Sequence, residues 1–485
     1  MKSTGSLTKK TTTALIWSFS DLMANHGIQF IVQVILARIL LPEHFGIIGM
    51  ILVFIAISNS IVDSGFTQAL IRDQHTTQED YSTVFYFNLC MSFILYGILF
   101  TSSEAISIFF REPQLVEIIR LLSLVIIINS LAIIQRVILM KKLDFQTITK
   151  ISMSASLISG TVTVTVALLG FGVWSLVINM ITLQFMQTFL LFIYNRWFPS
   201  LKFNYQSFKR FFGFGSRLLL SGLIDTIYHN MYFLIIGKLF STLHLGYYTN
   251  AVKFRDIASQ SLASTVQRVT YPVLSSIQDE EERLHEAFKK IIRMSAFINF
   301  PLLIGLAAIA NPLFYILFGE KWMPSVAYFQ LLCLAGMLYP LHAINLNILQ
   351  VKGKSDLFLL SEIIKKVVLS LLIITSLVLQ LGIFGLICAA VINSYISLFI
   401  NIYFSAKQLA YSVLEQLKDL LPSFLISSIM GGIVFSLGIF LPYPHFIQLI
   451  FQLIIGVSMY VGMSRIFKIQ ELTMLYSLII SKGEK

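Results

Sequence analysis

Long apolar stretches, separated by short polar breaks, cover almost the whole sequence and predict helices that cross a membrane. A spanning helix needs about 20 mostly apolar residues, and fourteen stretches are long enough. Polar residues interrupt several of them, so a total of twelve spans stays open as an alternative. The stretches lie near residues 12–39, 46–70, 82–109, 115–140, 146–169, 172–194, 208–239, 244–272, 287–317, 325–350, 356–380, 382–406, 417–440 and 445–467. We therefore expect an all-α polytopic membrane protein with about 14 transmembrane helices.

Composition supports this fold class. The chain of 485 residues is 56% hydrophobic and 12% charged, with a mean hydropathy of +0.80. Soluble domains contain about 25% charged residues, so a water-soluble fold would leave much apolar surface in water. The longest hydrophilic stretch, near 275–290, is too short to form a domain of its own. The helices are therefore expected to carry the function.

The net charge of +11 indicates membrane orientation rather than a nucleic-acid partner. If the N-terminus is cytoplasmic, the segments on that side hold 21 lysine and arginine residues and the opposite side holds 4. An excess of basic residues in cytoplasmic loops is the rule for membrane proteins. We therefore expect both termini to be cytoplasmic.

A short motif recurs along the chain. The segment from Ala37 to Gly46 is echoed by the segment from Gly237 to Gly246, and each copy closes one apolar stretch and opens the next. An internal echo of this kind points to a transporter built from two related halves, with the substrate site between them. We expect a six-helix lobe over 1–200, a second six-helix lobe over 201–407, and two additional transmembrane helices with a cytoplasmic tail over 408–485.

Several functional classes are disfavoured. The loops expected on the opposite face, such as 41–44 and 170–172, are too short to carry the acidic catalytic residues of a membrane polymerase. The chain has no phosphate-binding loop of the GxxxxGK[ST] type. Its three cysteines lie in apolar stretches without a CxxC pair, which favours packing roles. No secretory signal peptide is recognisable. We expect a transporter rather than an enzyme, with neither catalytic residues nor a metal site.

Polar side chains are concentrated in four predicted spans, the first two of each half. A Lys, Arg or Asp at the centre of a spanning helix costs about 2.5–3.5 kcal/mol, so these groups are expected to face water, one another or a polar ligand. A water-filled cavity lined by spans 1, 2, 7 and 8 would satisfy all four helices. The candidate cavity residues are Asp21, Asn25, Asp63, Arg217, Asp225, His229, Tyr247, Tyr248, Asn250, Lys253, Arg255, Asp256 and Gln260.

The basic side chains of the eighth span favour an anionic substrate. Lys253 and Arg255 lie within this span, and guanidinium groups bind phosphate through paired hydrogen bonds. Arg217 lies near a cytoplasmic helix end, and snorkelling to lipid headgroups is an equal alternative for it. Because Arg255 and Asp256 are adjacent, we expect them to point in different directions and not simply to neutralise each other. Lys253 and Gln260 are the alternative partners of Asp256 along the helix.

The remaining polar residues of these spans are candidates for ion coupling or for lining the cavity. For the aspartates, hydrogen bonding between helices is the commoner use. Interior histidines such as His229 most often have satisfied hydrogen bonds, and proton coupling is the less common use. The candidates in this group are Asp21, Asn25, Asp63, Asp225, His229 and Asp256.

Three segments carry a family resemblance. The run from Ile35 to Gly46 resembles the end of the first helix of polysaccharide flippases, and the run from Asp63 to Ile71 is similar to the end of their second. The run from Tyr247 to Ala251 is similar to the branch that includes colanic-acid and teichuronic-acid exporters. These O-antigen-type flippases belong to the multidrug/oligosaccharidyl-lipid/polysaccharide export superfamily. The resemblance covers essentially the whole chain, including the two extra C-terminal spans.

The resemblance implies a flippase that moves a polyprenyl-diphosphate-linked oligosaccharide between leaflets of the bacterial cytoplasmic membrane by alternating access. It implies diphosphate contacts from Lys253 and Arg255, with Arg217 as a third. Sugar hydroxyls would contact four side chains, Tyr247, Tyr248, Asn250 and Gln260. The implied energy source is an ion gradient, H⁺ or Na⁺, without a cofactor. Implied partners are membrane lipids, a polysaccharide polymerase and glycosyltransferases.

Three alternatives remain. A multidrug exporter of the same superfamily shares the architecture, but its usual cationic substrates prefer an acidic cavity. A flippase for the peptidoglycan precursor differs only in the headgroup that it carries. A polysaccharide polymerase or ligase is disfavoured by the short external loops.

Overall fold

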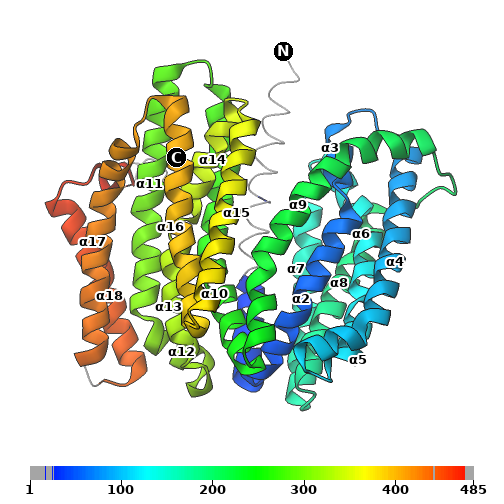
Figure 1. The fold of residues 1–485 in the computed structure, drawn as a ribbon, viewed down its shortest axis with the longest axis horizontal. Coiled ribbons are helices and arrows are strands. Elements are labelled where there is room, and N and C mark those ends of the chain that lie inside the picture. The colour runs from blue at the N-terminus through cyan, green and yellow to red at the C-terminus, as the bar shows by residue number, and fades with distance from the viewer. Residues whose placement is uncertain (1–16, 18–24, 26, 441–442, 476–485) are drawn as a thin grey trace. The chain divides into compact units, whose positions relative to one another are not determined.

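The computed structural model describes residues 17, 25, 27–440 and 443–475. Over these ranges the regular structure is helical, and no strand is present (Figure 1). The first predicted span lies partly outside the described residues; its continuous described part is the apolar helix Gly27–Ile39. The chain folds into two compact units, Met1–Thr249 and Asn250–Lys485.

The first unit contains eight labelled helices after Gly27–Ile39, together with the start of α10. Short helices pair end to end where a predicted span is interrupted, as in α2 with α3 and α5 with α6. The helices are α2 (Pro42–Asp63), α3 (Phe66–Arg72), α4 (Gln78–Phe110), α5 (Leu115–Leu122), α6 (Leu124–Lys141), α7 (Phe145–Leu168), α8 (Val173–Asn195), α9 (Tyr205–Leu239) and α10 (Thr242–Ser276).

The second unit contains the rest of α10 and eight further α-helices. Predicted spans 9 and 10 are each formed by two consecutive helices, α11 with α12 and α13 with α14. The helices are α11 (Glu281–Ala308), α12 (Ala310–Phe318), α13 (Ser325–Gly336), α14 (Tyr339–Val351), α15 (Ser355–Val378), α16 (Gly382–Leu409), α17 (Val413–Phe440) and α18 (His445–Ile466).

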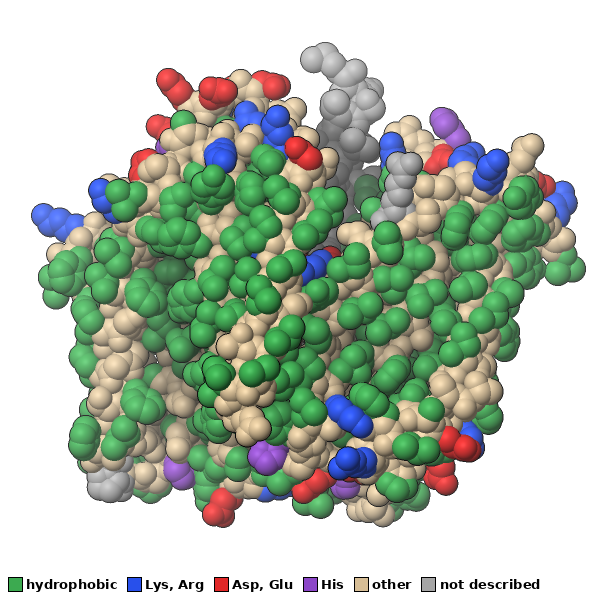
Figure 2. Space-filling view, in the orientation of Figure 1, with side chains coloured by type: hydrophobic (Ala, Val, Ile, Leu, Met, Phe, Trp, Pro, Cys, Tyr) green, Lys and Arg blue, Asp and Glu red, His purple; other side chains and the backbone are tan. Residues whose placement is uncertain are grey.

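The predicted fold class is confirmed. Eleven described stretches are long and apolar enough to cross a membrane. Two further long helices, α10 and α15, coincide with predicted spans. Helix α10 carries the charged residues described above, and α15 carries Glu362, Lys365 and Lys366. In Figure 2, hydrophobic side chains cover the middle of the helices on the visible face, and most charged side chains lie near the helix ends. The chain is an all-α polytopic membrane protein with about 14 transmembrane helices.

The two compact units do not coincide with the predicted sequence halves. Helix α9 follows residue 200, yet it packs against α2 and α4 of the first unit. Its close approach is possible at the α2–α3 break, where a Cβ on Gly65 would lie 2.7 Å from the carbonyl oxygen of Gly215. Gly65 also has a positive φ of 70°, which glycine adopts without strain. The lobe boundaries 1–200, 201–407 and 408–485 stay a prediction.

A ladder of three basic side chains on one face of α11 holds the C-terminal helices in the second unit. His285 contacts the carbonyl oxygen of Leu409 at 3.0 Å. Lys289 forms ion pairs with Glu415 at 3.0 Å and Asp419 at 3.2 Å. The third rung is Arg293, whose Nε lies 2.5 Å from Oε1 of Glu471. Positions four apart share a helix face, so the ladder binds the end of α16, α17 and the segment after α18 to the same side of α11.

Lys289→Met should destabilise the second unit, because it leaves two partly buried carboxylates without their common cation. Hydrogen bonds to charged groups contribute about 1.5–3 kcal/mol each, so a clear fall in melting temperature is expected in detergent. The matched control is Lys290→Met, since Lys290 is exposed. Equal melting temperatures for the two variants would contradict the structural role of the ladder.

Candidate functional site

Arg255 in α10 is buried and held by two neighbours. Its side chain forms an ion pair with Asp256, with Nη2 2.6 Å from Oδ1, and Nε donates to the same oxygen at 2.8 Å. Nη1 donates to the hydroxyl of Tyr339 at 2.9 Å. The expectation that adjacent Arg255 and Asp256 do not neutralise each other is wrong. The long arginine side chain folds back along the helix and reaches the carboxylate of the next residue.

Arg255 also takes part in the packing of α10 against α13 and α14. The guanidinium carbon lies 5.2 Å from the centroid of the Tyr339 ring, so the same tyrosine supplies a cation–π contact. A Cβ on Gly336 would lie 2.9 Å from Cδ of Arg255 and 3.2 Å from Oγ of Ser259. Arg255 is only 5% exposed. These contacts make it a structural link within the second unit as well as a candidate ligand residue.

Lys253 differs from Arg255 although it lies only two residues away. Its side chain is partly exposed. Within the described part of the chain, its ammonium group has neither a hydrogen-bond acceptor nor an ion-pair partner. A lysine in the middle of a membrane helix is costly unless an anion or water meets it. Lys253 is therefore the described basic residue of α10 that is available for an anionic ligand.

The four predicted sugar-contacting residues lie in different environments. Tyr248 is 5% exposed and packs against Tyr232 and Phe233 of α9, with ring centroids 6.2 Å and 5.5 Å away. Asn250 is fully buried. Tyr247 is half-buried and Gln260 is exposed. The last two are accessible to a ligand, whereas the first two belong to the packing of α10.

The polar residues predicted for the first half mostly serve helix contacts. Asn25 accepts from Ser156 of α7 at 2.6 Å and from Gln29 at 3.2 Å. Asp63 accepts from the backbone N–H of Thr67 at 3.3 Å and from its hydroxyl, and thereby caps α3.

Four of the predicted residues are either exposed or outside the described part of the chain. Asp225 and His229 are exposed on α9. Asp21 lies outside the described residues, and so does the side chain of Arg217. Because α10 extends into the second unit, the proposed common cavity of spans 1, 2, 7 and 8 stays a prediction.

The prediction from sequence missed Arg136, a basic residue whose charge interacts with that of Asp63 without an ion pair or hydrogen bond between them. This arginine lies in α6, and its charge interacts with that of the Asp63 carboxylate on α2. The sequence could have indicated this residue, because Arg136 lies inside the apolar stretch 115–140 and a charged side chain in a membrane helix needs a polar neighbour.

An amide network joins helices of the first unit, and its partners were not predicted from the sequence. Asn129 of α6 donates to Asn59 of α2 at 3.0 Å, and Gln184 of α8 donates to Asn129 at 3.2 Å. Thr188 donates to the carbonyl oxygen of Ile128 at 3.0 Å. Such bonds join membrane helices in place of the hydrophobic effect, which is weak in lipid. The polarity of span 2 therefore serves in part to bind α2 to its neighbours.

A second polar cluster lies between α14 and α16. The two ring nitrogens of His342 lie 3.2 Å from the hydroxyl of Ser394 and 3.1 Å from the amide nitrogen of Asn401. Ser394 in turn donates to the carbonyl oxygen of Ala335 at 3.2 Å. Ser405 donates to Asn345 at 2.5 Å. Both nitrogens of the histidine thus have partners, which fits the commoner use of an interior histidine.

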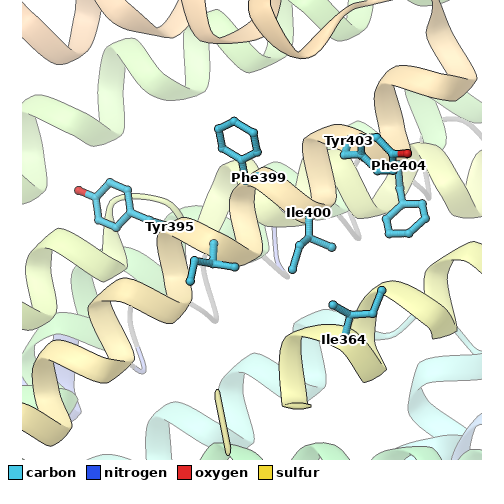
Figure 3. A pocket seen from close by; sticks show the side chains of 7 residues that line it. Ile364, Tyr395, Phe399, Ile400, Tyr403 and Phe404 are labelled. Atoms are coloured by element: carbon cyan, nitrogen blue, oxygen red, sulfur yellow. The ribbon is translucent and has the colours of Figure 1, made fainter. Parts of the chain in front are cut away.

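A groove of about 590 Å³ runs between α15 and α16 (Figure 3). Ile364 lines it from α15, and Phe399 and Ile400 line it from α16, together with other apolar and aromatic side chains. No charged side chain lines this groove among the described residues. Its chemistry suits lipid rather than a sugar-diphosphate headgroup. The described residues likewise contain no group of three metal-binding side chains.

Comparisons with known proteins agree on family and fold. A family model described as "Polysaccharide biosynthesis protein" matches residues 35–327. The chain is 28% identical to the teichuronic acid biosynthesis protein TuaB of Bacillus subtilis over 80% of each chain. It is 26% identical to the lipopolysaccharide biosynthesis protein WzxC of Escherichia coli over 82% of each. A structure of the lipid II flippase MurJ matches with a TM-score of 0.74 and 16% identity, covering 94% of this chain and 98% of that one.

Tyr339→Phe should lower stability, because it removes the hydroxyl that accepts from buried Arg255 but keeps the ring. A lost hydrogen bond to a charged group corresponds to about 1.5–3 kcal/mol. The matched control is Tyr395→Phe, whose hydroxyl forms no hydrogen bond with any described residue. Thermal unfolding in detergent measures the difference, and unchanged stability of Tyr339→Phe would refute the structural role of this contact.

Proposed function

The chain belongs to the polysaccharide biosynthesis protein family, and from this premise we propose that it is a flippase for a polyprenyl-diphosphate-linked oligosaccharide. It would carry repeat units from the inner to the outer leaflet of the bacterial cytoplasmic membrane, for surface polysaccharide. Both termini would face the cytoplasm. The relatives named for teichuronic acid and lipopolysaccharide biosynthesis support this substrate class.

The observation that carries the proposal is the contrast between two basic residues of α10. Arg255 is neutralised by Asp256 and bonded to Tyr339. Lys253 has no such partner among the described side chains. A diphosphate would supply the missing negative charge, and its interaction with an ammonium group is strong where water is scarce. We therefore assign the first diphosphate contact to Lys253 and a supporting contact to Arg255.

The other contacts follow from accessibility. Tyr247 and Gln260 are the accessible candidates for sugar hydroxyls, on the same helix as Lys253. Arg217 stays a candidate third basic contact. The polyprenyl tail would remain in the bilayer while the headgroup crosses by alternating access between two repeated lobes. An ion gradient of H⁺ or Na⁺ would drive the cycle, with exposed Asp225 and His229 of α9 as candidate coupling groups.

The same contrast weighs against the alternatives. The ammonium group of Lys253 has no anionic partner among the described residues of this chain. Such a group would repel the cationic substrates of a multidrug exporter. A peptidoglycan-precursor flippase uses the same diphosphate chemistry and differs in the sugar. Polymerase activity usually needs acidic catalytic residues on sizeable external loops, and the loops expected outside the membrane are short.

Lys253→Gln should abolish export of surface polysaccharide while protein level and melting temperature stay normal, because the ammonium group of Lys253 forms no hydrogen bond or ion pair with any described residue. Lys253→Arg should retain a substantial part of export, since the charge is kept. Lys407→Gln is the control, because this lysine is exposed near the end of α16. Export is measured as surface polysaccharide in a deletion strain that carries each variant. Normal export by Lys253→Gln would remove Lys253 from the site.

A strain that lacks the protein should accumulate a complete polyprenyl-diphosphate oligosaccharide on the cytoplasmic leaflet. Mass spectrometry of extracted lipids identifies the repeat unit, and protection from an external glycosidase shows the leaflet. Accumulation of peptidoglycan precursor would instead assign the alternative headgroup. Sensitivity to cationic drugs without any lipid accumulation would contradict the flippase proposal.

A further inference from the structure

The connector between α8 and α9, residues 196–204, exposes large apolar side chains. Leu201 is 95% exposed, Phe198 67% and Phe203 55%. Tyr205, the first residue of α9, is 69% exposed. A group of large apolar side chains that a protein leaves uncovered indicates a contact with a membrane or with another molecule.

The main chain of the connector is fixed against the start of α4 (Figure 1). Gln78 of α4 donates to the carbonyl oxygen of Phe198 at 2.8 Å, and the backbone N–H of Ser200 donates to the hydroxyl of Ser82 at 2.9 Å. The backbone N–H of Asn204 donates to a threonine hydroxyl of the same helix at 3.0 Å. Turning the apolar side chains inward would break these bonds and leave backbone groups without partners. The exposure is therefore a fixed property of this fold.

The length of α8 places the connector at the membrane surface. This helix has 23 residues, so it is about 34 Å long at 1.5 Å per residue. The hydrocarbon core of a bilayer is about 30 Å thick. The connector follows one end of α8, and the loop 169–172 precedes the other end and exposes Leu169 and Phe171. Both groups of apolar side chains thus lie where α8 leaves the hydrocarbon.

Charge distinguishes these two ends of α8. Residues 196–210 include four basic residues and no acidic one, whereas the loop 169–172 has no charged residue. Arg210 is held by Asp80 at 2.9 Å. Lys202 pairs with Glu79 at 3.2 Å, but both side chains are exposed, and an ion pair in water contributes little. The connector therefore combines apolar side chains with basic groups that an external anion can reach.

We propose that the connector 196–204, together with the start of α9, is an interfacial anchor that binds anionic phospholipids of the cytoplasmic leaflet. Its apolar side chains insert among the lipid headgroups, and exposed Arg196, Lys202 and Lys209 bind lipid phosphates. The charge distribution predicts the cytoplasmic side for this end of α8. Aromatic and basic side chains in one segment are typical of membrane interfaces, and basic groups there attract anionic lipid. The inference does not depend on the proposed flippase function.

A fluorophore on the connector tests whether it lies in lipid or in water. In a chain with Cys90, Cys333 and Cys388 replaced by serine, bimane is attached to Leu201→Cys in nanodiscs of phosphatidylcholine and phosphatidylglycerol. A lipid spin-labelled near its headgroup should quench this bimane strongly, and aqueous acrylamide should quench it weakly. The control is bimane on Gln74→Cys, in the exposed turn before α4, which should show the opposite pattern. Equal acrylamide quenching at the two positions would show that the connector lies in water, and the anchor would be refuted.

Lipid composition tests the role of the basic side chains. Nanodiscs with phosphatidylglycerol should lower acrylamide quenching at Leu201→Cys about twofold relative to pure phosphatidylcholine. Acrylamide is neutral, so the surface potential does not change its local concentration. Replacing Arg196, Lys202 and Lys209 by glutamine should remove this difference. The matched control is bimane on Leu169→Cys, in the uncharged loop, where quenching should not depend on the lipid.

Melting temperatures in detergent show that each variant is folded before it is compared. A phosphatidylglycerol effect that survives in the triple glutamine variant, or that is equal in the uncharged loop, would contradict selection of anionic lipid by these basic residues. Protection of Leu201→Cys in native membranes but not in nanodiscs would identify a protein partner as the occupant and overturn the proposal.

Discussion

The ion pair and hydrogen bonds of Arg255 meet the main constraint on this chain, which is that a charge within a membrane helix needs a partner. An isolated charge at the bilayer centre costs much free energy. The guanidinium group of Arg255 avoids this cost by an ion pair with Asp256 and a hydrogen bond to Tyr339. Gly336 leaves the space in which these groups meet. The need of a membrane charge for polar neighbours also accounts for the surroundings of Asp63. Its carboxylate caps α3, and its charge interacts with that of Arg136. These polar residues of the membrane helices thus stabilise the packing of the helices.

This constraint also separates structural from functional polarity. A polar side chain with a full set of partners, such as His342 between Ser394 and Asn401, is explained by packing alone. A charged side chain that has none in the described part of the chain, as with Lys253, requires a ligand or water to explain it. The difference between Lys253 and Arg255 gives the proposed diphosphate site its physical basis.

The starts of α2 and α10 show a second way of joining helices, through close backbone approach at Gly46 and Gly246 rather than through charge. Gly46 and Gly246 bring α2 and α10 closer than any side chain would allow. In contrast, the ladder of Lys289 and Arg293 with its acidic partners holds α11 to the C-terminal helices through several ion pairs. Contacts of the first kind can separate without leaving buried charges, whereas contacts of the second kind resist separation.

The sequence by itself determined the fold class and the places of the spans, because the cost of exposing polar backbone to lipid forces long apolar stretches into helices. It also identified α10 as unusually charged and the two motifs as related. Only the tertiary structure decided which charges are neutralised, since the rotamer of Arg255 and the nearness of Tyr339 depend on helices distant in sequence. The contact of Gly46 with Thr242 was hidden for the same reason. Periodicity specifies which face of a helix is polar, whereas the partner of each side chain depends on how the helices pack.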